Sequence, residues 1–358
     1  MYTNWKKILI SPATPIIDTM RLIDEVAMQI VLVVDEGNRL MGTVTDGDIR
    51  RAILKGNSLE EPVQNVMNTR PTAFKSDESR EDMLVAMRLL KISKVPIIDN
   101  GNRVVGLEIL DELLKPKPRD NPVVLMAGGL GSRLGSLTKD CPKPLLPIGG
   151  QPVLQTILES FISFGFHRFY FSVNYKAEMI KQHFGDGSRW NVEIQYIEED
   201  KRMGTAGALS LLPEKPDMPF FVMNGDILTK VNFLQLLEFH ADHRAVATMC
   251  AFRYDMQIPY GVLQVDKHRL VEINEKPVQS FFVNAGIYVL SPETLQHIPT
   301  ESFYDMPTLF EKLIHDNKET AVFPLREYWL DIGQITDFKR AQGDFANFFK
   351  PKEDSQAE

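Results

Sequence analysis

This sequence of 358 residues has little cysteine, no long apolar run and no excess of positive charge. Its two cysteines, Cys141 and Cys250, provide neither a disulfide framework nor the ligand spacing of a zinc site. No apolar run approaches the roughly 20 residues that span a bilayer, and the apolar residues 8–10 are too few for the core of a signal peptide. We therefore expect a cytoplasmic protein without a membrane partner.

The formal net charge of −8 argues against nucleic acid as a partner, because a nucleic-acid-binding protein presents a basic face. Small anionic substrates stay open, since a few local lysines and arginines can outweigh a diffuse negative field. Hydrophobic residues make up 44% of the chain, enough to bury a sizeable core. The length suits two or three domains.

An internal repeat occupies the first third of the chain. Residues 31–42 recur 64 positions later as residues 95–106, with six of twelve positions identical. Each copy has the pattern of a strand, a Gly-Asn turn and a second strand, and follows a helical pattern at residues 18–30 or 77–92. A unit of about 60 residues buries a marginal core by itself, so we expect the two copies to form one module.

The repeat resembles a tandem pair of CBS domains, a family that often binds adenine nucleotides. Its ribose-binding motif, Gly-x-x-Thr/Ser-x-x-Asp, corresponds here to Gly42, Thr45 and Asp48. The second copy has Ile109 and Glu112 at the matching positions, so one regulatory nucleotide site is implied. Two plainer alternatives stay open: the threonine and aspartate cap the next helix, or the pair serves self-association.

The second part of the chain has a different pattern. After a Pro- and charge-rich stretch at residues 115–122, residues 123–127 form a continuous apolar run of the buried-strand type. Strand-like and helical runs then alternate, which predicts βαβ crossovers in a doubly wound, mostly parallel sheet with ligands at its carboxyl edge. The strand patterns lie at residues 169–173, 192–197 and 220–223, and the helical ones at 177–184, from 204 onward and at 232–243.

A glycine-rich loop containing an arginine follows the first strand of this part. Glycines let backbone N–H groups approach phosphate oxygens, and Arg133 can form paired hydrogen bonds to a polyphosphate. The loop does not match the dinucleotide-binding motif of dehydrogenases, because Leu134 occupies the position of that motif's third glycine. The downstream segment is Pro142-Lys143-Pro144, where that motif would have a strand that ends in an acidic residue. The predicted phosphate-binding residues of the loop are Ala127, Gly128, Gly129, Gly131 and Ser132.

The loop and the Pro-Lys-Pro segment resemble the signature of the sugar-1-phosphate nucleotidyltransferases, whose fold is Rossmann-like or GT-A-like. The resemblance covers the whole second part and implies that Arg133 holds the departing β,γ-phosphates and Lys143 the α-phosphate. A serine, Ser136, replaces the family's proline after an added glycine, Gly135, which should loosen the loop. The whole chain is then expected to be α/β, with the CBS pair at 1–117 (about 1–60 and 61–117), a linker at 118–122, the transferase domain at 123–350 and a polar tail at 351–358.

Two aspartates match the metal ligands of this family. Asp226 ends the strand-like run that begins at Phe220, and Asp331 stands beside Gly333. Mg²⁺ typically takes one or two carboxylates together with phosphates and water. The resemblance therefore implies Mg²⁺ as cofactor, whereas an aspartate that only caps a turn is the plainer alternative.

The resemblance also implies positions for the sugar and the base. Gly261, Glu275, Asn284 and Gly286 would surround the sugar, and Lys276 would neutralise its phosphate as a third catalytic cation. Gly204, Thr205, Ala206 and Gly207 lie in a segment most like that of the guanylyltransferases. There the glycines would leave a flat slot for the base, and amides at a helix N-terminus would meet its polar edge.

These expectations combine into one reaction. A sugar 1-phosphate attacks the α-phosphorus of a nucleoside triphosphate in line and releases pyrophosphate, without a general base because the phosphate is already mostly dianionic at pH 7. GTP is the favoured triphosphate. Glucosamine 1-phosphate or a related hexose 1-phosphate is the favoured sugar, because a CBS pair before a compact transferase resembles the guanylyltransferases of bacterial legionaminic acid synthesis. We expect a homo-oligomer; a uridylyl- or thymidylyltransferase and a catalytically inactive nucleotide sensor are the alternatives.

Overall fold

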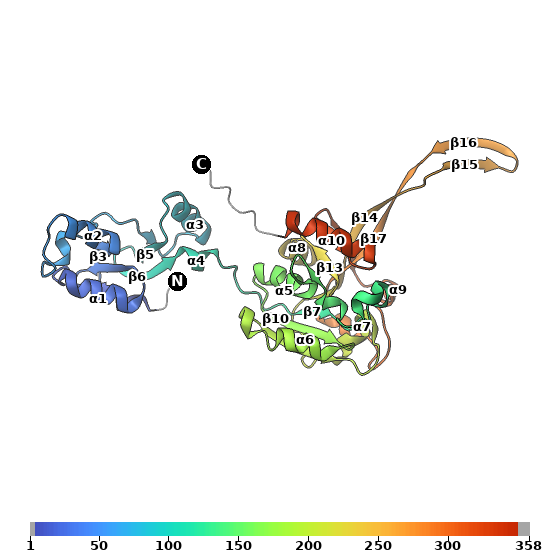
Figure 1. Ribbon diagram of the computed structural model, residues 1–358, viewed down its shortest axis with the longest axis horizontal. Coiled ribbons are helices and arrows are strands. Elements are labelled where there is room, and N and C mark those ends of the chain that lie inside the picture. The colour runs from blue at the N-terminus through green and yellow to red at the C-terminus, as the bar shows by residue number, and fades with distance from the viewer. Residues whose placement is uncertain (1–3, 350–358) are drawn as a thin grey trace. The chain divides into compact units, whose positions relative to one another are not determined.

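The computed structural model describes residues 4–349, and the chain divides into two compact units, Met1–Pro116 and Lys117–Glu358 (Figure 1). The predicted polar tail at 351–358 lies outside the described residues. Across the described part of the chain, no helix combines the length and the apolar character that crossing a membrane requires.

The first unit contains two three-stranded sheets of identical topology, in which the first strand is parallel and the third antiparallel to the middle one. The strands are β1 (Leu9–Ile10), β2 (Ile30–Val34), β3 (Leu40–Thr45), β4 (Phe74–Lys75), β5 (Lys94–Ile98) and β6 (Val104–Ile109). The helices are η1 (Trp5–Ile8), α1 (Ile16–Val26), α2 (Asp46–Leu54), η2 (Val63–Asn65), α3 (Arg80–Leu89) and α4 (Leu110–Leu114), where η denotes a 3₁₀ helix.

The two repeats meet through their turns in a nearly symmetric way. Leu40 donates its backbone N–H to the carbonyl of Asn102, and Val104 donates to the carbonyl of Asn38, both over 2.9 Å. Both asparagines have a positive φ, which this residue tolerates better than most. Helix α1 ends earlier than its sequence pattern predicts, because Ala27 adopts a left-handed conformation and the chain enters β2 at Ile30.

The second unit is built on a sheet of seven strands, counted over residues 4–349. Its order is β11-β10-β7-β12-β17-β14-β18, and β17 is the strand that runs against the other six. The doubly wound, mostly parallel sheet predicted from the sequence is thus confirmed. The bounds are β7 (Val123–Met126), β10 (Arg168–Val173), β11 (Glu193–Glu198), β12 (Phe220–Asn224), β14 (Ala247–Gln257), β17 (Val278–Leu290) and β18 (Thr320–Leu325).

Helices cover both faces of this sheet. The faces are distinct because successive side chains of a strand alternate: Val123 and Leu125 belong to one apolar cluster and Val124 to another. The first cluster includes residues of α5 (Val153–Ser163), α6 (Ala177–Phe184), α8 (Phe233–Asp242) and α10 (Ile335–Phe348). The second includes residues of α7 (Gly204–Gly207), η6 (Ala208–Leu211) and α9 (Met306–His315).

Short elements complete the second unit. Three two-stranded ladders join β8 (Pro147–Ile148) to β9 (Gln151–Pro152), β13 (Ile227–Thr229) to β19 (Trp329–Asp331), and β15 (Gly261–Asp266) to β16 (Arg269–Glu275). The remaining 3₁₀ helices are η3 (Ser132–Thr138), η4 (Lys143–Leu145), η5 (Ser188–Trp190) and η7 (Pro292–His297).

Strands β14 and β17 are longer than their neighbours and continue outward as a two-stranded ribbon. Beyond Phe252 and Val283 the ribbon leaves the sheet and leads into the β15–β16 hairpin, which projects from the body of the unit (Figure 1). We call residues 253–282 the arm. Every residue of β15 and β16 is exposed.

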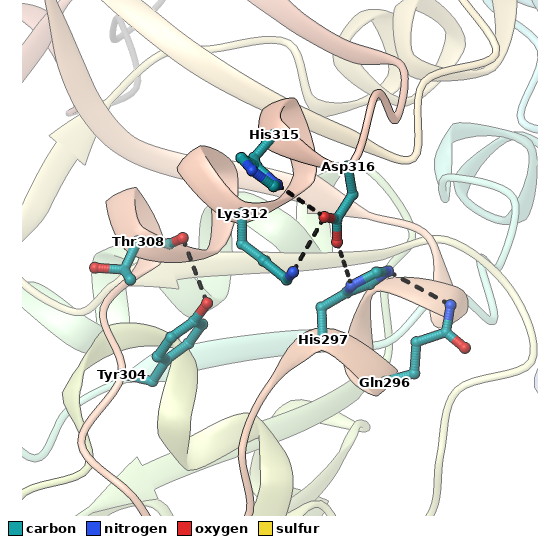
Figure 2. A network of polar contacts seen from close by, with 7 residues as sticks. All are labelled: Gln296, His297, Tyr304, Thr308, Lys312, His315 and Asp316. Atoms are coloured by element: carbon teal, nitrogen blue, oxygen red, sulfur yellow. Dashed lines mark hydrogen bonds and ion pairs between the residues drawn. The ribbon is translucent and has the colours of Figure 1, made fainter.

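Polar contacts of Asp316 stabilise the C-terminal end of helix α9. Asp316 accepts a hydrogen bond from Lys312 over 3.0 Å, and the rings of His315 and His297 lie 3.2 and 3.5 Å from its carboxylate (Figure 2). At the other end of the helix, the Tyr304 hydroxyl donates to the Thr308 carbonyl over 3.4 Å. These contacts fix the segment that leads into α9 and that borders the candidate site described below.

A buried histidine makes the stability of this unit depend on pH. His240 is 2% exposed and contacts the hydroxyls of Thr248 and Ser291 over 2.9 and 3.1 Å. Burial lowers its pKa from the ordinary 6.5 to about 4. Between these values the unfolded chain binds the proton and the folded chain does not, so stability falls as the pH falls through this window, by on the order of 3 kcal/mol.

We predict that His240→Gln, which cannot be protonated, flattens the fall in unfolding free energy between pH 6.5 and pH 4. Urea unfolding at both pH values measures it. His268→Gln, at an exposed histidine, is the control and should keep the wild-type slope. An unchanged slope in His240→Gln would assign the pH dependence to other groups.

Candidate active site

The two predicted metal ligands come together through the β13–β19 ladder. Ile227 pairs with Asp331, and the N–H of Ile332 donates to the carbonyl of Asp226 over 3.1 Å. Burial raises the pKa of Asp331, and the neighbouring carboxylate of Asp226 raises it further. Two carboxylates that were 105 positions apart in the sequence therefore share one electrostatic environment.

A lysine balances part of this negative charge. Lys143, from the predicted Pro-Lys-Pro segment, donates to Oδ2 of Asp226. The other oxygen, Oδ1, is buried and has no hydrogen-bond partner among residues 4–349. An unpartnered carboxylate oxygen beside a second carboxylate is suited to a divalent cation. Over the same residues no group of three metal-ligating side chains occurs, so a cation here would also need phosphate or water ligands.

The glycine-rich loop folds against the same lysine. Gly131 has a φ of +65°, and a Cβ at this position would lie 2.8 Å from Cγ2 of Thr138 and 3.0 Å from Cβ of Lys143. The Thr138 hydroxyl donates to the Gly131 carbonyl over 2.9 Å and closes the loop. The structure thus requires glycine at residue 131 to let the loop approach the lysine.

The added glycine interrupts η3. Gly135 has φ and ψ of 58° and −121°, and an added Cβ would meet nothing within 4 Å among the described residues. A conformation that other residues rarely adopt, in open surroundings, agrees with the looser loop expected from the sequence.

Two adjoining cavities open beside these groups. The smaller has a volume of about 180 Å³ and the larger about 460 Å³. Four residues line both, namely Gly129, Arg133, Arg202 and Asp226. Other predicted residues border one cavity: Gly131, Ser132 and Lys143 the smaller, and Gly128, Gly204 and Thr205 the larger. Ala127, Ala206 and Gly207 are buried and line neither.

The glycines and amides of segment 204–207, which we expected to bind the base, contact residues 302–305 in this structure. The two glycines pack closely against residues 302–304. A Cβ added at Gly204 would lie 2.6 Å from the carbonyl oxygen of Tyr304, and a Cβ added at Gly207 would lie 2.5 Å from the carbonyl oxygen of Ser302. The helix N-terminal amides are also in use, since Thr205 donates to Asp305 over 3.1 Å. Ala206 and Gly207 donate to Tyr304 over 2.9 and 2.8 Å. Residues 304 and 305 thus accept the amides of Thr205, Ala206 and Gly207 in this structure, and base binding by the segment stays a prediction.

The predicted sugar residues divide into two groups. Gly286 has a φ of +68° in the bulge of β17 and lies against Asn224, whose Nδ2 would be 2.7 Å from an added Cβ. Asn284 accepts from the N–H of Gly286 over 2.9 Å and donates to the hydroxyl of Tyr288 over 2.8 Å. Gly286 therefore lies beside Asn224, which lines the larger cavity, and Asn284 is joined to Gly286.

The other group lies on the arm. Gly261 pairs with Glu275 at the base of the β15–β16 hairpin, and Lys276 follows with a φ of 46°. Strand β17 begins at Val278, two residues after Lys276, and its six steps to Asn284 span about 20 Å. Within one copy, the structure does not bring Gly261, Glu275 and Lys276 to the two cavities.

Sequence reasoning missed several residues of the site. Arg202 lines both cavities, and Glu199 and Asp305 line the larger one. Glu199 accepts from the N–H of Met203 over 3.0 Å and from the Ser172 hydroxyl, so it also braces the strand. The basic pair before Gly204 was a signal for Arg202, whereas Asp305 could be found only from the packing of a segment 100 residues away.

In the first unit, Thr45 and Asp48 form a capping box at the start of α2, which is the helix-capping role considered as an alternative to ligand binding. They also line a cavity of about 540 Å³ with Arg51, Arg70 and Lys91. Ile109 and Glu112 are not among its lining residues. The geometry therefore agrees with both the capping and the ligand hypotheses for the first copy.

Comparisons with known proteins match the two units to two different families. The family model described as nucleotidyl transferase matches residues 122–347, and that of the CBS domain matches residues 5–55. Mannose-1-phosphate guanyltransferase of Candida albicans is 33% identical over 228 residues, which are 60% of this chain and 62% of that protein. The catalytic subunit beta of mannose-1-phosphate guanylyltransferase from Drosophila pseudoobscura pseudoobscura is 32% identical over 60% of each chain. The chain thus spans about 60% of the length of these relatives.

A crystal structure of HddC from Yersinia pseudotuberculosis, complexed with GMP-PN, is similar in fold. It superposes with a TM-score of 0.51 and 27% sequence identity, over 63% of this chain and 99% of that one.

We predict that Gly131→Ala destabilises the second unit by about 1–2 kcal/mol, because alanine is strained at positive φ and its Cβ would collide with Thr138. The unfolding midpoint in calorimetry should fall by a few degrees. Gly129→Ala is the matched control, since an added Cβ there meets no described atom within 4 Å. Equal losses in both variants would show that the close contact at residue 131 is not the cause.

Proposed function

Since this chain belongs to the nucleotidyl transferase family, as the sequence predicted, we propose that it couples a sugar 1-phosphate with GTP to give a GDP-sugar and pyrophosphate. The observation that carries this proposal is the arrangement of the loop and Lys143 around Asp226, beside Asp331. The guanylyl assignment is supported by the names of the relatives and by the GMP-PN complex of HddC. A hexose or hexosamine 1-phosphate, glucosamine 1-phosphate first, is the proposed sugar substrate.

In the proposed mechanism the protein positions two phosphates and neutralises their charge. Arg133 and Arg202 face both cavities and would hold the triphosphate, while Lys143 would turn from Asp226 towards the α-phosphate. Mg²⁺, held by Asp226 and Asp331, would supply further positive charge to the phosphate oxygens. No protein base is needed, because a sugar phosphate is mostly dianionic at pH 7.

The proposal is tested by pyrophosphate release with Mg²⁺, using GTP, UTP, dTTP, CTP and ATP with a panel of hexose and hexosamine 1-phosphates. Release with GTP and one sugar is the expected result. A preference for UTP or dTTP would instead make the chain a uridylyl- or thymidylyltransferase. Nucleotide binding without release for any pair would favour the inactive sensor.

We also propose that the first unit binds an adenine nucleotide in the cavity beside Thr45 and Asp48, and that this ligand regulates the transferase. The cations Arg51, Arg70 and Lys91 in its lining support a phosphate-bearing ligand. Titration calorimetry with ATP and AMP tests this. The cytoplasmic location and the homo-oligomeric state stay predictions.

We predict that Asp226→Asn lowers turnover at least about 100-fold with the fold intact, because the amide cannot replace a metal-binding carboxylate. Pyrophosphate release measures the loss, and circular dichroism checks the fold. Asp217→Asn, at an exposed aspartate of the same unit, is the control and should keep wild-type turnover. Near-normal turnover in Asp226→Asn would remove this residue from the metal site.

A further inference from the structure

The arm presents an apolar face that no described residue covers. Cross-strand partners point to the same face of a ladder, so Leu263 with Ile273 and Val265 with Leu270 form one apolar face. Leu263 and Ile273 are 56% and 57% exposed. Gln264 with Glu272 lies on the opposite face, so the hairpin alternates like a strand pair that is solvated on one side and buried on the other.

Predicted substrate-binding residues lie at the end of this apolar face. Gly261 pairs with Glu275 two positions from the Leu263–Ile273 pair, which places Glu275 on the same face, and Lys276 follows directly. Whatever surface covers the apolar face would also receive Glu275 and would have Lys276 next to it, at the end of the hairpin. A partner that fits must therefore combine an apolar contact with a site for an acid and a cation.

The arm cannot reach its own site while its strands stay paired. The β14–β17 ladder continues to the pair Gln257–Val278. Ile258 then donates to the carbonyl of Pro277 over 3.0 Å, and Lys276 to that of Tyr260 over 3.3 Å, just before the hairpin begins. The paired ribbon holds Val278, two residues after Lys276, about 20 Å along the strand from Asn284. Folding back would break these backbone hydrogen bonds, whereas docking on another molecule would keep them.

The side chains that line the two cavities include as many carboxylates as cations. The residues that line the two cavities include the cations Arg133, Lys143 and Arg202, and Lys143 is paired with Asp226. The acids around them are Asp226, Glu199 and Asp305. Two phosphate-bearing substrates together would be stabilised by a further positive charge, which Lys276 of an arm would supply in addition to the proposed Mg²⁺.

We propose that two copies of this chain exchange arms, so that the arm of one copy covers the site of the other and brings Glu275 and Lys276 to its sugar phosphate. Two-fold symmetry makes the exchange reciprocal and buries both apolar faces. The sugar-phosphate role of Lys276 rests on the proposed function; the exchange of arms does not. Each complete site then contains the loop and aspartates of one copy and the arm of the other.

Disulfide trapping tests the exchange without any need for turnover. In a Cys141→Ser background, the variant that carries both Lys276→Cys and Leu130→Cys places one thiol on the arm and one at the smaller cavity. Mild oxidation should give a covalent dimer on a non-reducing gel. The control replaces Lys276→Cys by Gln264→Cys, on the polar face, and should stay monomeric. An intrachain disulfide, no disulfide, or equal dimer in the control would overturn the exchange.

Mixing two inactive variants tests whether the exchanged arm completes the site. Asp226→Asn keeps an intact arm, and Lys276→Ala keeps an intact body. After joint unfolding and refolding, half of the dimers are mixed, and each has one complete site, so about a quarter of wild-type turnover should return. No recovery, or full activity of Lys276→Ala by itself, would overturn the delivery of Lys276. An inactive wild-type protein that still forms the covalent dimer would contradict the proposed function alone.

Discussion

The ion pair between Lys143 and Asp226 joins two parts of the chain that are 83 residues apart. It matters because Asp226 and Asp331 lie together, and two carboxylates at one place repel each other unless a cation offsets them. Burial, and then the repulsion from Asp226, raise the pKa of Asp331. The glycine-rich loop depends on the same lysine, since a side chain at residue 131 would collide with it. The loop, the lysine and the strand end therefore form one structural unit.

The larger cavity has a wall made from two segments about 100 residues apart. Residues 302–305 satisfy the amides of α7 and lie against its glycines, and Asp305 itself borders the cavity. Gly204 and Gly207, which we expected to leave space for a base, are also required for the close packing of α7 against residues 302–304. The polar contacts at Asp316 and Thr308 hold α9, and with it the segment that forms this wall (Figure 2).

The arm places a different constraint on the molecule. An isolated two-stranded ribbon with an exposed apolar face is marginally stable in water. Sharing the arm between copies would cover that face and would make each site depend on two chains. Turnover would then depend on protein concentration near the dissociation constant of the dimer, because a separated copy has an incomplete site.

Local patterns in the sequence were sufficient to predict the sheet, the repeated module and the position of the loop. The alternation of apolar strands and amphipathic helices determined the doubly wound sheet, because side-chain period reflects burial directly. The duplicated segment determined the matching hairpins of the first unit, and the strand-end position of Asp226 indicated the carboxyl edge of the sheet. The loop glycines likewise predicted a close backbone approach, which Gly131 makes.

Tertiary structure alone decided the remainder, because it depends on contacts between residues far apart in the chain. The pairing of Lys143 with Asp226, the position of Arg202 beside both cavities and the use of the α7 amides by residues 302–305 have no local signature. The same holds for the arm. The two ladders that keep Lys276 away from its own site depend on strand register, which pairs residues 253–257 with 278–282 and residues 261–266 with 269–275.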